Sequence, residues 1–247
     1  MSFLFRQSVV KYKKWLYFVI GKDKFMKREI PVEELQRLYG LGDLVKADCM
    51  GCDGCSACCR GMGSSVVLDP FDLFRMEAGL GVSFAALLED KIELNTVDGL
   101  VLPNIRMSGE GESCVFLDGS GRCQIHRFRP GLCRLFPLGR YYEGGSFRYY
   151  LQKSQCPKEN RAKIKVKKWI DTPEPVKNEE YILSWHDFQK KLQACFDRTE
   201  EEKLKNDVNT FVLKLFYSEP YDSDHDFYEQ FQFRLKKAER LLELIDW

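Results

Sequence analysis

The sequence predicts an α+β fold: a compact, metal-stapled cysteine-cluster domain with short hairpins and helices, followed by a C-terminal helical bundle. Nine of the ten cysteines lie between residues 49 and 156. The same region contains short runs of β-forming residues around glycine turns, which is typical of hairpins. Beyond residue 175, apolar residues recur three and four positions apart, which is typical of amphipathic helices.

Composition divides the 247 residues into four predicted segments. They are amphipathic helices over 1–48, the cysteine-cluster domain over 49–157, a basic segment and linker over 158–175, and a helical region over 176–247. Hydrophobic residues make up 44% and charged residues 30% of the chain, so a folded core is expected. The net charge of +1 is too small to produce an electrostatic field that attracts nucleic acid, so no nucleic-acid partner is expected.

The longest apolar run near the N-terminus covers residues 15–20. It is much shorter than the roughly 20 residues that span a bilayer, so no membrane span is expected. The run also lacks the features of a secretory signal, and we expect a cytoplasmic protein. Because disulfides are rare in that compartment, the ten cysteines favour metal binding over a disulfide framework.

The N-terminal segment predicts an amphipathic helix, because apolar residues recur at helical spacing between Phe5 and Val19. Packing of this helix on the protein body is the favoured interpretation, and binding to a membrane surface is the alternative. A second, short helix is expected to start after Pro31 and to end by Gly40.

The first part of the cysteine-cluster domain predicts both helices and strands. Asp69 and Pro70 are typical of a helix start, and Gly79 is typical of a helix end. A second helix is expected over 83–89. Strands are expected over 66–68, 92–94 and 100–107. The last of these is expected at a sheet edge, because Pro103 lacks an N–H donor.

Two hairpins are predicted further along this domain. The first turns at residues 118–121, between Cys114 and Cys123, and the second turns at Gly144 and Gly145. A hairpin brings its two flanks together, so the first one can deliver two thiols to a common site. Cys133 is expected in a short helix that follows residues 129–132.

The C-terminal region predicts three helices. Their apolar stripes run from Tyr181 to Cys195, from Leu204 to Leu215 and from Phe227 to Ile245. Thr199 and Glu202 have capping-box spacing for the second helix. Because Cys195 continues an apolar stripe, we interpret it as a core residue and exclude it from the site. The helices are also the expected surface for a protein partner.

The cysteine run begins with Cys49, Cys52, Cys55 and Cys58, each separated by two residues, and Cys59 follows directly. Cys-x2-Cys spacing lets two thiolates bind one metal from a tight turn. Adjacent side chains in an extended segment point apart. Cys58 and Cys59 are therefore expected to serve different metal positions or different edges of the site.

Four further cysteines lie downstream: Cys114, Cys123, Cys133 and Cys156. Nine thiols are enough for two four-thiolate centres with one to spare. Such centres carry a net negative charge, which nearby arginines are expected to compensate. The candidate arginines are Arg60, Arg122, Arg127, Arg129, Arg134 and Arg140.

The region 49–157 carries a series of short motifs. They are Cys52-x2-Cys55-x2-Cys58-Cys59-Arg60, Val67-Leu-Asp-Pro-Phe-Asp-Leu-Phe, Cys114-Val-Phe-Leu-Asp, Gly121-Arg-Cys123-Gln-Ile-His, Arg129-Pro-Gly-Leu-Cys133-Arg-Leu-Phe-Pro137 and Cys156-Pro157. In order and spacing, these motifs resemble the YkgJ-type cysteine-cluster family. That family is also called the CxxCxxCC putative zinc- or iron-chelating domain.

The resemblance implies a compact α+β domain and a set of metal-site positions. These positions are Cys52, Cys55, Cys58, Cys59, Cys114, Cys123, Cys133 and Cys156. Cys49 extends the run beyond the usual pattern, and it is either a replacement ligand or a spare thiol. The resemblance leaves zinc and iron–sulfur clusters open. Some relatives carry the name flagellin lysine N-methylase.

We expect a metal-binding protein with a multi-cysteine iron–sulfur or zinc site that is structural or redox-active. A methylase-like enzyme acting on protein lysines and a metal storage or delivery protein are the alternatives. The sequence contains no HExxH, P-loop or GxSxG motif and no radical-SAM cysteine spacing in its cysteine run, so no catalytic residue is assigned. The Cys-x2-Cys-x2-Cys run with a distant Cys-Pro slightly favours iron–sulfur over zinc.

Overall fold

The structure is a computed structural model that describes residues 32–50, 55–153, 155–158 and 160–245. The helix predicted between Phe5 and Val19 lies outside the described residues. Helices and strands are mixed along the chain, which confirms the α+β class. Within the described part of the chain, no helix has the length and apolar character needed to cross a bilayer.

The strands of the described residues form four separate two-stranded antiparallel sheets. The pairs are β1 (Leu44–Asp48) with β8 (Ala162–Lys165), β2 (Ile92–Val97) with β3 (Leu100–Ile105), β4 (Met107–Ser108) with β5 (Ser113–Cys114), and β6 (Leu138–Glu143) with β7 (Ser146–Leu151). The strands predicted over 92–94 and 100–107 and the hairpin around Gly144 and Gly145 are confirmed. The basic run at 158–168 contributes strand β8.

Strand β1 corrects the expectation that residues 1–48 contain only helices. In β1, Val45 and Ala47 are buried, whereas Leu44 and Lys46 are exposed. The alternation is typical of a strand, but the exposed leucine and the small alanine weaken that signal in the sequence. The short helix predicted after Pro31 is confirmed as α2 (Val32–Leu35).

The predicted turn at residues 118–121 is confirmed, but the residues on its two sides form fewer backbone pairs than a hairpin would. Cys114 pairs with Met107 in β4, while Leu117 and Cys123 form an isolated bridge across the turn. The Asp118 carboxylate closes the turn by accepting hydrogen bonds from the backbone N–H groups of Ser120 at 2.9 Å and of residue 122 at 2.8 Å. A side-chain oxygen thus replaces part of the strand pairing.

Helix α3 (Pro70–Leu80) begins where the sequence predicts it but ends two residues later than expected. Asp69 and Asp72 form a capping box in which each carboxylate accepts the other's backbone N–H. The helix ends at Gly81, whose φ is 68°, rather than at Gly79. Gly79 lies against the ring of Phe128, where an added Cβ would come within 2.5 Å of ring carbons.

Apart from the helix at Val166–Ile170, which lies in the segment predicted as a basic segment and linker over 158–175, the remaining helices follow the sequence predictions closely. Helix α4 (Phe84–Asp90) is capped by Ser83, and Cys133 lies in the short helix α5 (Gly131–Leu135). The helices after residue 158 are α6 (Val166–Ile170), α7 (Pro175–Phe196), α8 (Glu202–Leu213) and α9 (Phe227–Glu243). Helix α8 continues into a π-helical turn, η4 (Lys214–Ser218).

The capping box predicted at Thr199 is wrong. The N-cap of α8 is Glu201, which makes no side-chain cap. The Thr199 hydroxyl instead accepts a hydrogen bond from the Glu201 backbone N–H at 3.1 Å. This local two-residue turn occupies the oxygen that a cap would need.

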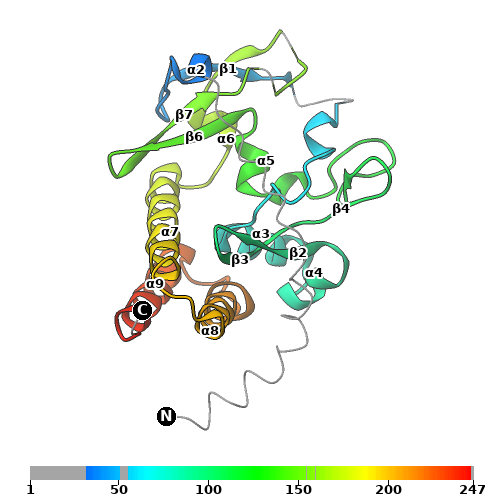
Figure 1. The fold of residues 1–247 in the computed structure, drawn as a ribbon. Helices are drawn as coiled ribbons and strands as arrows, with labels where there is room; N and C mark the ends of the chain where they lie inside the picture. Colours follow the sequence, from blue (N-terminus) through cyan, green and yellow to red (C-terminus); the bar gives the residue numbers. More distant parts are fainter. Residues whose placement is uncertain (1–31, 51–54, 154, 159, 246–247) are drawn as a thin grey trace.

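Two hydrophobic clusters hold the described residues together. The larger one combines residues of α3 and the β2–β3 hairpin with residues of α7, α8 and α9. Within it, the rings of Phe71 and Phe227 lie 4.9 Å apart and those of Tyr181 and Phe231 lie 4.6 Å apart. The smaller cluster combines residues of β1, β6, β7, α5 and α6. Figure 1 shows the three C-terminal helices gathered on one side and β1, β6 and β7 at one end.

Asn209 of α8 generates a test of how the C-terminal helices are attached. Its buried side chain accepts from the Val101 backbone N–H at 2.9 Å and donates to the Gly99 carbonyl at 3.1 Å. Asn209→Ala leaves the buried Val101 N–H without this acceptor, so we expect the free energy of unfolding to fall by about 1–3 kcal/mol. Denaturant titration measures the change.

The control for this experiment is Asn206→Ala, which changes an exposed asparagine on the same helix. We expect its effect to stay within roughly 0.5 kcal/mol. Equal losses in the two variants would show that Asn209 does not fix α8 to the hairpin.

Candidate metal centre

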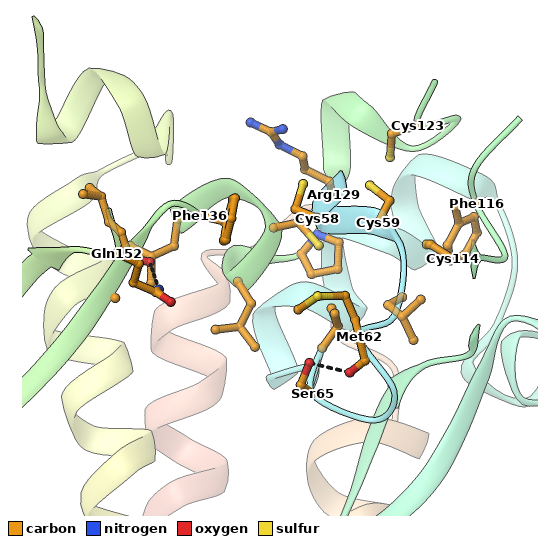
Figure 2. A pocket seen from close by; sticks show the side chains of 18 of the residues that line it. Cys58, Cys59, Met62, Ser65, Cys114, Phe116, Cys123, Arg129, Phe136 and Gln152 are labelled. Carbon is orange, nitrogen blue, oxygen red and sulfur yellow. Dashed lines mark hydrogen bonds between the residues drawn. The ribbon is translucent and has the colours of Figure 1, made fainter. Parts of the chain in front are cut away.

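Five cysteines from four separate segments of the domain line one cavity of about 440 Å³. They are Cys58, Cys59, Cys114, Cys123 and Cys133. Figure 2 shows the first four gathered on one side of the cavity. All five belong to the positions that the sequence predicts for a metal site.

Cys58 and Cys59 lie in a single tight turn, η2 (Ala57–Cys59). The Cys59 backbone N–H donates to the Ser56 carbonyl at 2.9 Å, so the segment is a 3₁₀ turn rather than an extended one. The two side chains therefore line the same cavity, contrary to the expectation for adjacent residues in an extended segment.

Arg60 holds this turn against strand β5. Its Nη1 donates to the Ser113 hydroxyl at 2.6 Å, and its Nε donates to the Ser56 hydroxyl at 3.2 Å. The backbones of Arg60 and Ser113 also form an isolated bridge. Because Ser113 directly precedes Cys114, these contacts bring the Cys114 thiol to the two thiols of the turn.

The helix that carries Cys133 is positioned by a buried carboxylate. Asp72 Oδ1 accepts a hydrogen bond at 2.6 Å from the backbone N–H of Gly131, the first residue of α5. Asp72 is 5% exposed and lies in the capping box of α3. Sequence reasoning missed this role, because the signal at Asp69 and Pro70 indicates a helix start and says nothing about a distant partner.

Four of the cavity thiols, those of Cys58, Cys114, Cys123 and Cys133, have raised pKa values and are hard to ionise without a cation. A hydrogen bond with the Cys59 thiol, and then burial, raise the pKa of Cys58. Burial is the main cause that raises the pKa of Cys114, Cys123 and Cys133, and neighbouring thiols raise each of them further. A bound cation reverses this balance and stabilises thiolates. The chemistry of the donor set therefore fits a metal held by sulfur.

Two of the six candidate arginines, Arg129 and Arg140, line the cavity. The charge of Arg129 acts to lower the pKa of Cys58 and Cys123, so it favours their thiolates. Arg60 bonds to serines, and Arg134 donates to the Asp171 carbonyl and, at 2.6 Å, to the Thr172 hydroxyl.

The other predicted thiols lie elsewhere. Cys49 is buried directly after β1, and Cys55 and Cys156 are half-buried, but none of these three lines the cavity. Cys52 lies outside the described residues. Cys195 is buried in α7 and does not line the cavity, in agreement with its exclusion from the site.

The thiols surround the cavity without converging on one point. In the ranges that the structure describes, no three His, Cys, Asp or Glu side chains lie close enough together to hold one ion. Binding at this cavity would therefore draw the thiol side chains inward. Sequence reasoning also missed the wall formed by β6 and β7, whose aromatic residues indicate strands but not a cavity.

Comparison with known proteins adds one finding. Neither the search of curated proteins nor the search of solved structures found a match. Residues 51–158 match the family described as CxxCxxCC, putative zinc- or iron-chelating domain, which confirms the resemblance seen in the motifs. Residues 51–158 are therefore similar to the CxxCxxCC domain family.

Proposed function

We propose that this is a metal-binding protein whose CxxCxxCC domain holds zinc or iron through cysteine thiolates. The observation that supports the proposal best is the cavity lined by five cysteines from four segments that lie apart in the sequence. A buried free cysteine behaves as a small hydrophobic residue. Five at one cavity, inside a domain of this family, are better explained as ligands.

Cys58, Cys59, Cys114, Cys123 and Cys133 would supply the ligands. Four thiolates complete a zinc site or a cubane iron–sulfur cluster. The bound metal would cross-link the segments that carry these residues or, as an iron–sulfur cluster, carry electrons. Cys49, Cys52, Cys55 and Cys156 remain candidates for a second centre.

Elemental analysis and an absorption spectrum of protein purified without oxygen test the proposal directly. Iron and sulfide with a band near roughly 400 nm would identify an iron–sulfur protein. Colourless protein with stoichiometric zinc would identify a structural or delivery site. Protein that contains neither metal and fails to take up either one would contradict the proposal.

Single cysteine variants test the assignment of ligands. We expect Cys133→Ser to lower the metal content and the stability, because serine replaces a half-buried candidate ligand. Cys195→Ser, a change at a cysteine in α7 away from the cavity, should leave the metal content unchanged. Metal per chain is measured on purified protein. Equal metal loss in both variants would overturn the assignment.

Metal removal tests whether the site supports the fold. The cavity thiols come from η2, β5, the turn before η3 (His126–Phe128), and α5, so a metal would connect segments that are far apart in the chain. We expect a strong chelator to lower the midpoint of thermal unfolding, and re-addition of the same metal to restore it. An unchanged midpoint in verified metal-free protein would show that the metal has no structural role.

Variants of Asp72 test how α5, the helix that carries Cys133, is held in place. Asp72→Ala removes the acceptor for the Gly131 backbone N–H, two residues before Cys133. We expect metal affinity to fall by about 10–100-fold, as for other residues that orient ligands. Competition with a chelator of known affinity measures the loss.

Two further variants serve as controls for Asp72→Ala. Asp72→Asn keeps an oxygen acceptor and should retain more of the affinity. Asp187→Ala removes an exposed carboxylate from α7 and should have no effect. Unchanged affinity in Asp72→Ala would rule out the positioning role.

A further inference from the structure

The β1–β8 sheet has one buried face and one exposed face. Val45 of β1 and Ile164 of β8 are register partners, and both pack in the smaller hydrophobic cluster. The next register pair, Leu44 and Lys165, is exposed at both positions. Successive residues of a strand point to opposite faces, so this pair lies on the side away from the cluster. The sheet therefore covers the cluster with one face and presents the other to solvent.

Lysines dominate the exposed side of this sheet and the helix that follows it. Lys46 of β1 and Lys163 of β8 are exposed. The chain then enters α6, where Val166 and Ile170 are buried and two consecutive lysines between them are exposed. We use the name lysine face for the following six exposed residues: Leu44, Lys46, Lys163, Lys165, Lys167 and Lys168.

Neighbouring carboxylates do not neutralise this positive charge. Within the described part of the chain, no salt bridge involves any of the five lysines. The Asp43 carboxylate accepts from the Gly40 backbone N–H at 2.8 Å and lies 3.8 Å from Arg148 Nη2. Asp48 accepts from the Met50 backbone N–H at 2.9 Å. The net charge of the whole chain is only +1, so the lysine face is a local concentration of positive charge.

Two large apolar side chains are exposed in β1 and directly after it. Leu44 is 51% exposed, and Met50, two residues beyond the end of β1, is 75% exposed. Lysines combined with exposed apolar side chains are typical of surfaces that bind at the interface of a membrane. A lipid bilayer can take up the apolar groups below its headgroups, whereas a dissolved polyanion offers them no apolar surroundings.

The composition of residues 1–31 adds to the same end of the molecule. This segment contains eight lysines and arginines, only two acidic residues and the apolar run at 15–20. It leads into α2, which packs against β7, and β7 packs against β1. Figure 1 shows α2 and β1 together at one end of the fold. Membrane binding strengthens with buried apolar area and with attraction to anionic lipids, and this end supplies both.

Two features favour a lipid surface over nucleic acid. The cations of the lysine face are all point charges, without the planar fork with which arginine recognises nucleic acids. Stacking of bases also needs an accessible aromatic ring. Trp169, the aromatic residue of α6, is half-buried, and its indole N–H donates to the Leu135 carbonyl at 3.3 Å.

We propose that the lysine face binds the surface of an anionic lipid bilayer. The lysine ammonium groups contact the anionic lipid headgroups, and Leu44 and Met50 enter the apolar boundary beneath them. The contact holds the protein at the membrane without crossing it. The proposal goes beyond metal binding and does not depend on which metal the thiols hold.

Flotation with lipid vesicles tests the proposal on the full chain with its metal. The probe is vesicles of phosphatidylcholine with about 30% phosphatidylserine, and pure phosphatidylcholine vesicles are the comparison. We expect the protein to float with the anionic vesicles at low salt and to be released in about 0.5 M salt, which screens the charges. Failure to float with the anionic vesicles, or equal flotation with the neutral ones, would overturn the proposal.

A triple variant removes charge from the lysine face. Lys46→Gln/Lys163→Gln/Lys165→Gln should weaken binding to the anionic vesicles by about 100-fold, because each lysine near such a surface contributes roughly fivefold. Unchanged binding would show that residues 1–31 act alone and that the lysine face has no part in the contact.

The matched control removes the same charge from the C-terminal helices. Lys203→Gln/Lys236→Gln/Lys237→Gln changes three exposed lysines of α8 and α9. We expect its vesicle binding to stay within about twofold of the native chain, since these helices lie away from the lysine face. A loss equal to that of the first variant would mean that net charge alone drives binding, and would contradict a specific face.

The apolar part of the contact and the competing partner are tested separately. Leu44→Gln should weaken vesicle binding by about tenfold, whereas Val176→Gln, at a 61% exposed position of α7, should not. Equal binding by these two variants would contradict insertion of Leu44. A double-stranded DNA oligonucleotide serves as the second probe. Tighter binding of DNA than of anionic vesicles at the same salt concentration would overturn the proposal in favour of nucleic acid.

Discussion

Helix α3 starts inside the protein, so its first backbone groups must find partners other than water. The Phe71 N–H donates to the Tyr181 hydroxyl at 3.0 Å, and the Leu68 carbonyl accepts from the Tyr217 hydroxyl at 3.1 Å. The Asp72 carboxylate accepts from α5. One helix start thereby fixes α7, η4 and the helix that carries a candidate ligand. The positions of the C-terminal helices and of the thiols depend on the same few hydrogen bonds.

The C-terminal helices are consequently part of the framework around the site. They complete the larger hydrophobic cluster, and His186 of α7 supports an aromatic ring of the cavity wall. Buried apolar area stabilises by roughly 25 cal/mol per Å², so removing these helices would expose the aromatic face of α3 at a large cost in free energy. Any partner that binds these helices would contact elements that also hold the cavity.

The thiols depend on charge balance and on the exclusion of water. A hydrogen bond with the Cys59 thiol and partial burial raise the pKa of Cys58, and partial burial raises the pKa of Cys123, so a metal and Arg129 would have to balance these thiolates together. An apolar wall beside sulfur ligands keeps water away. Such surroundings influence the reduction potential of an iron–sulfur cluster and the affinity for a zinc ion.

The sequence by itself determined the local features of this protein. The start of α3 follows from Asp69 and Pro70, and the three C-terminal helices follow from their apolar stripes. The spacing of the cysteines indicates which thiols are candidate metal ligands. These signals are readable because caps, turns and periodicity act within a few residues. The end of α3 could not be predicted in this way, because Gly79 and Gly81 look alike in the sequence and the helix ends only at Gly81.

Only the tertiary structure decided which distant groups meet. It paired β1 with β8, brought five of the candidate thiols to one cavity and left three others away from it, and gave Asp72 its partner in α5. The cavity between the two hydrophobic clusters has no sequence signal of its own. Pairings of this kind depend on how whole elements pack, and no spacing along the chain encodes them.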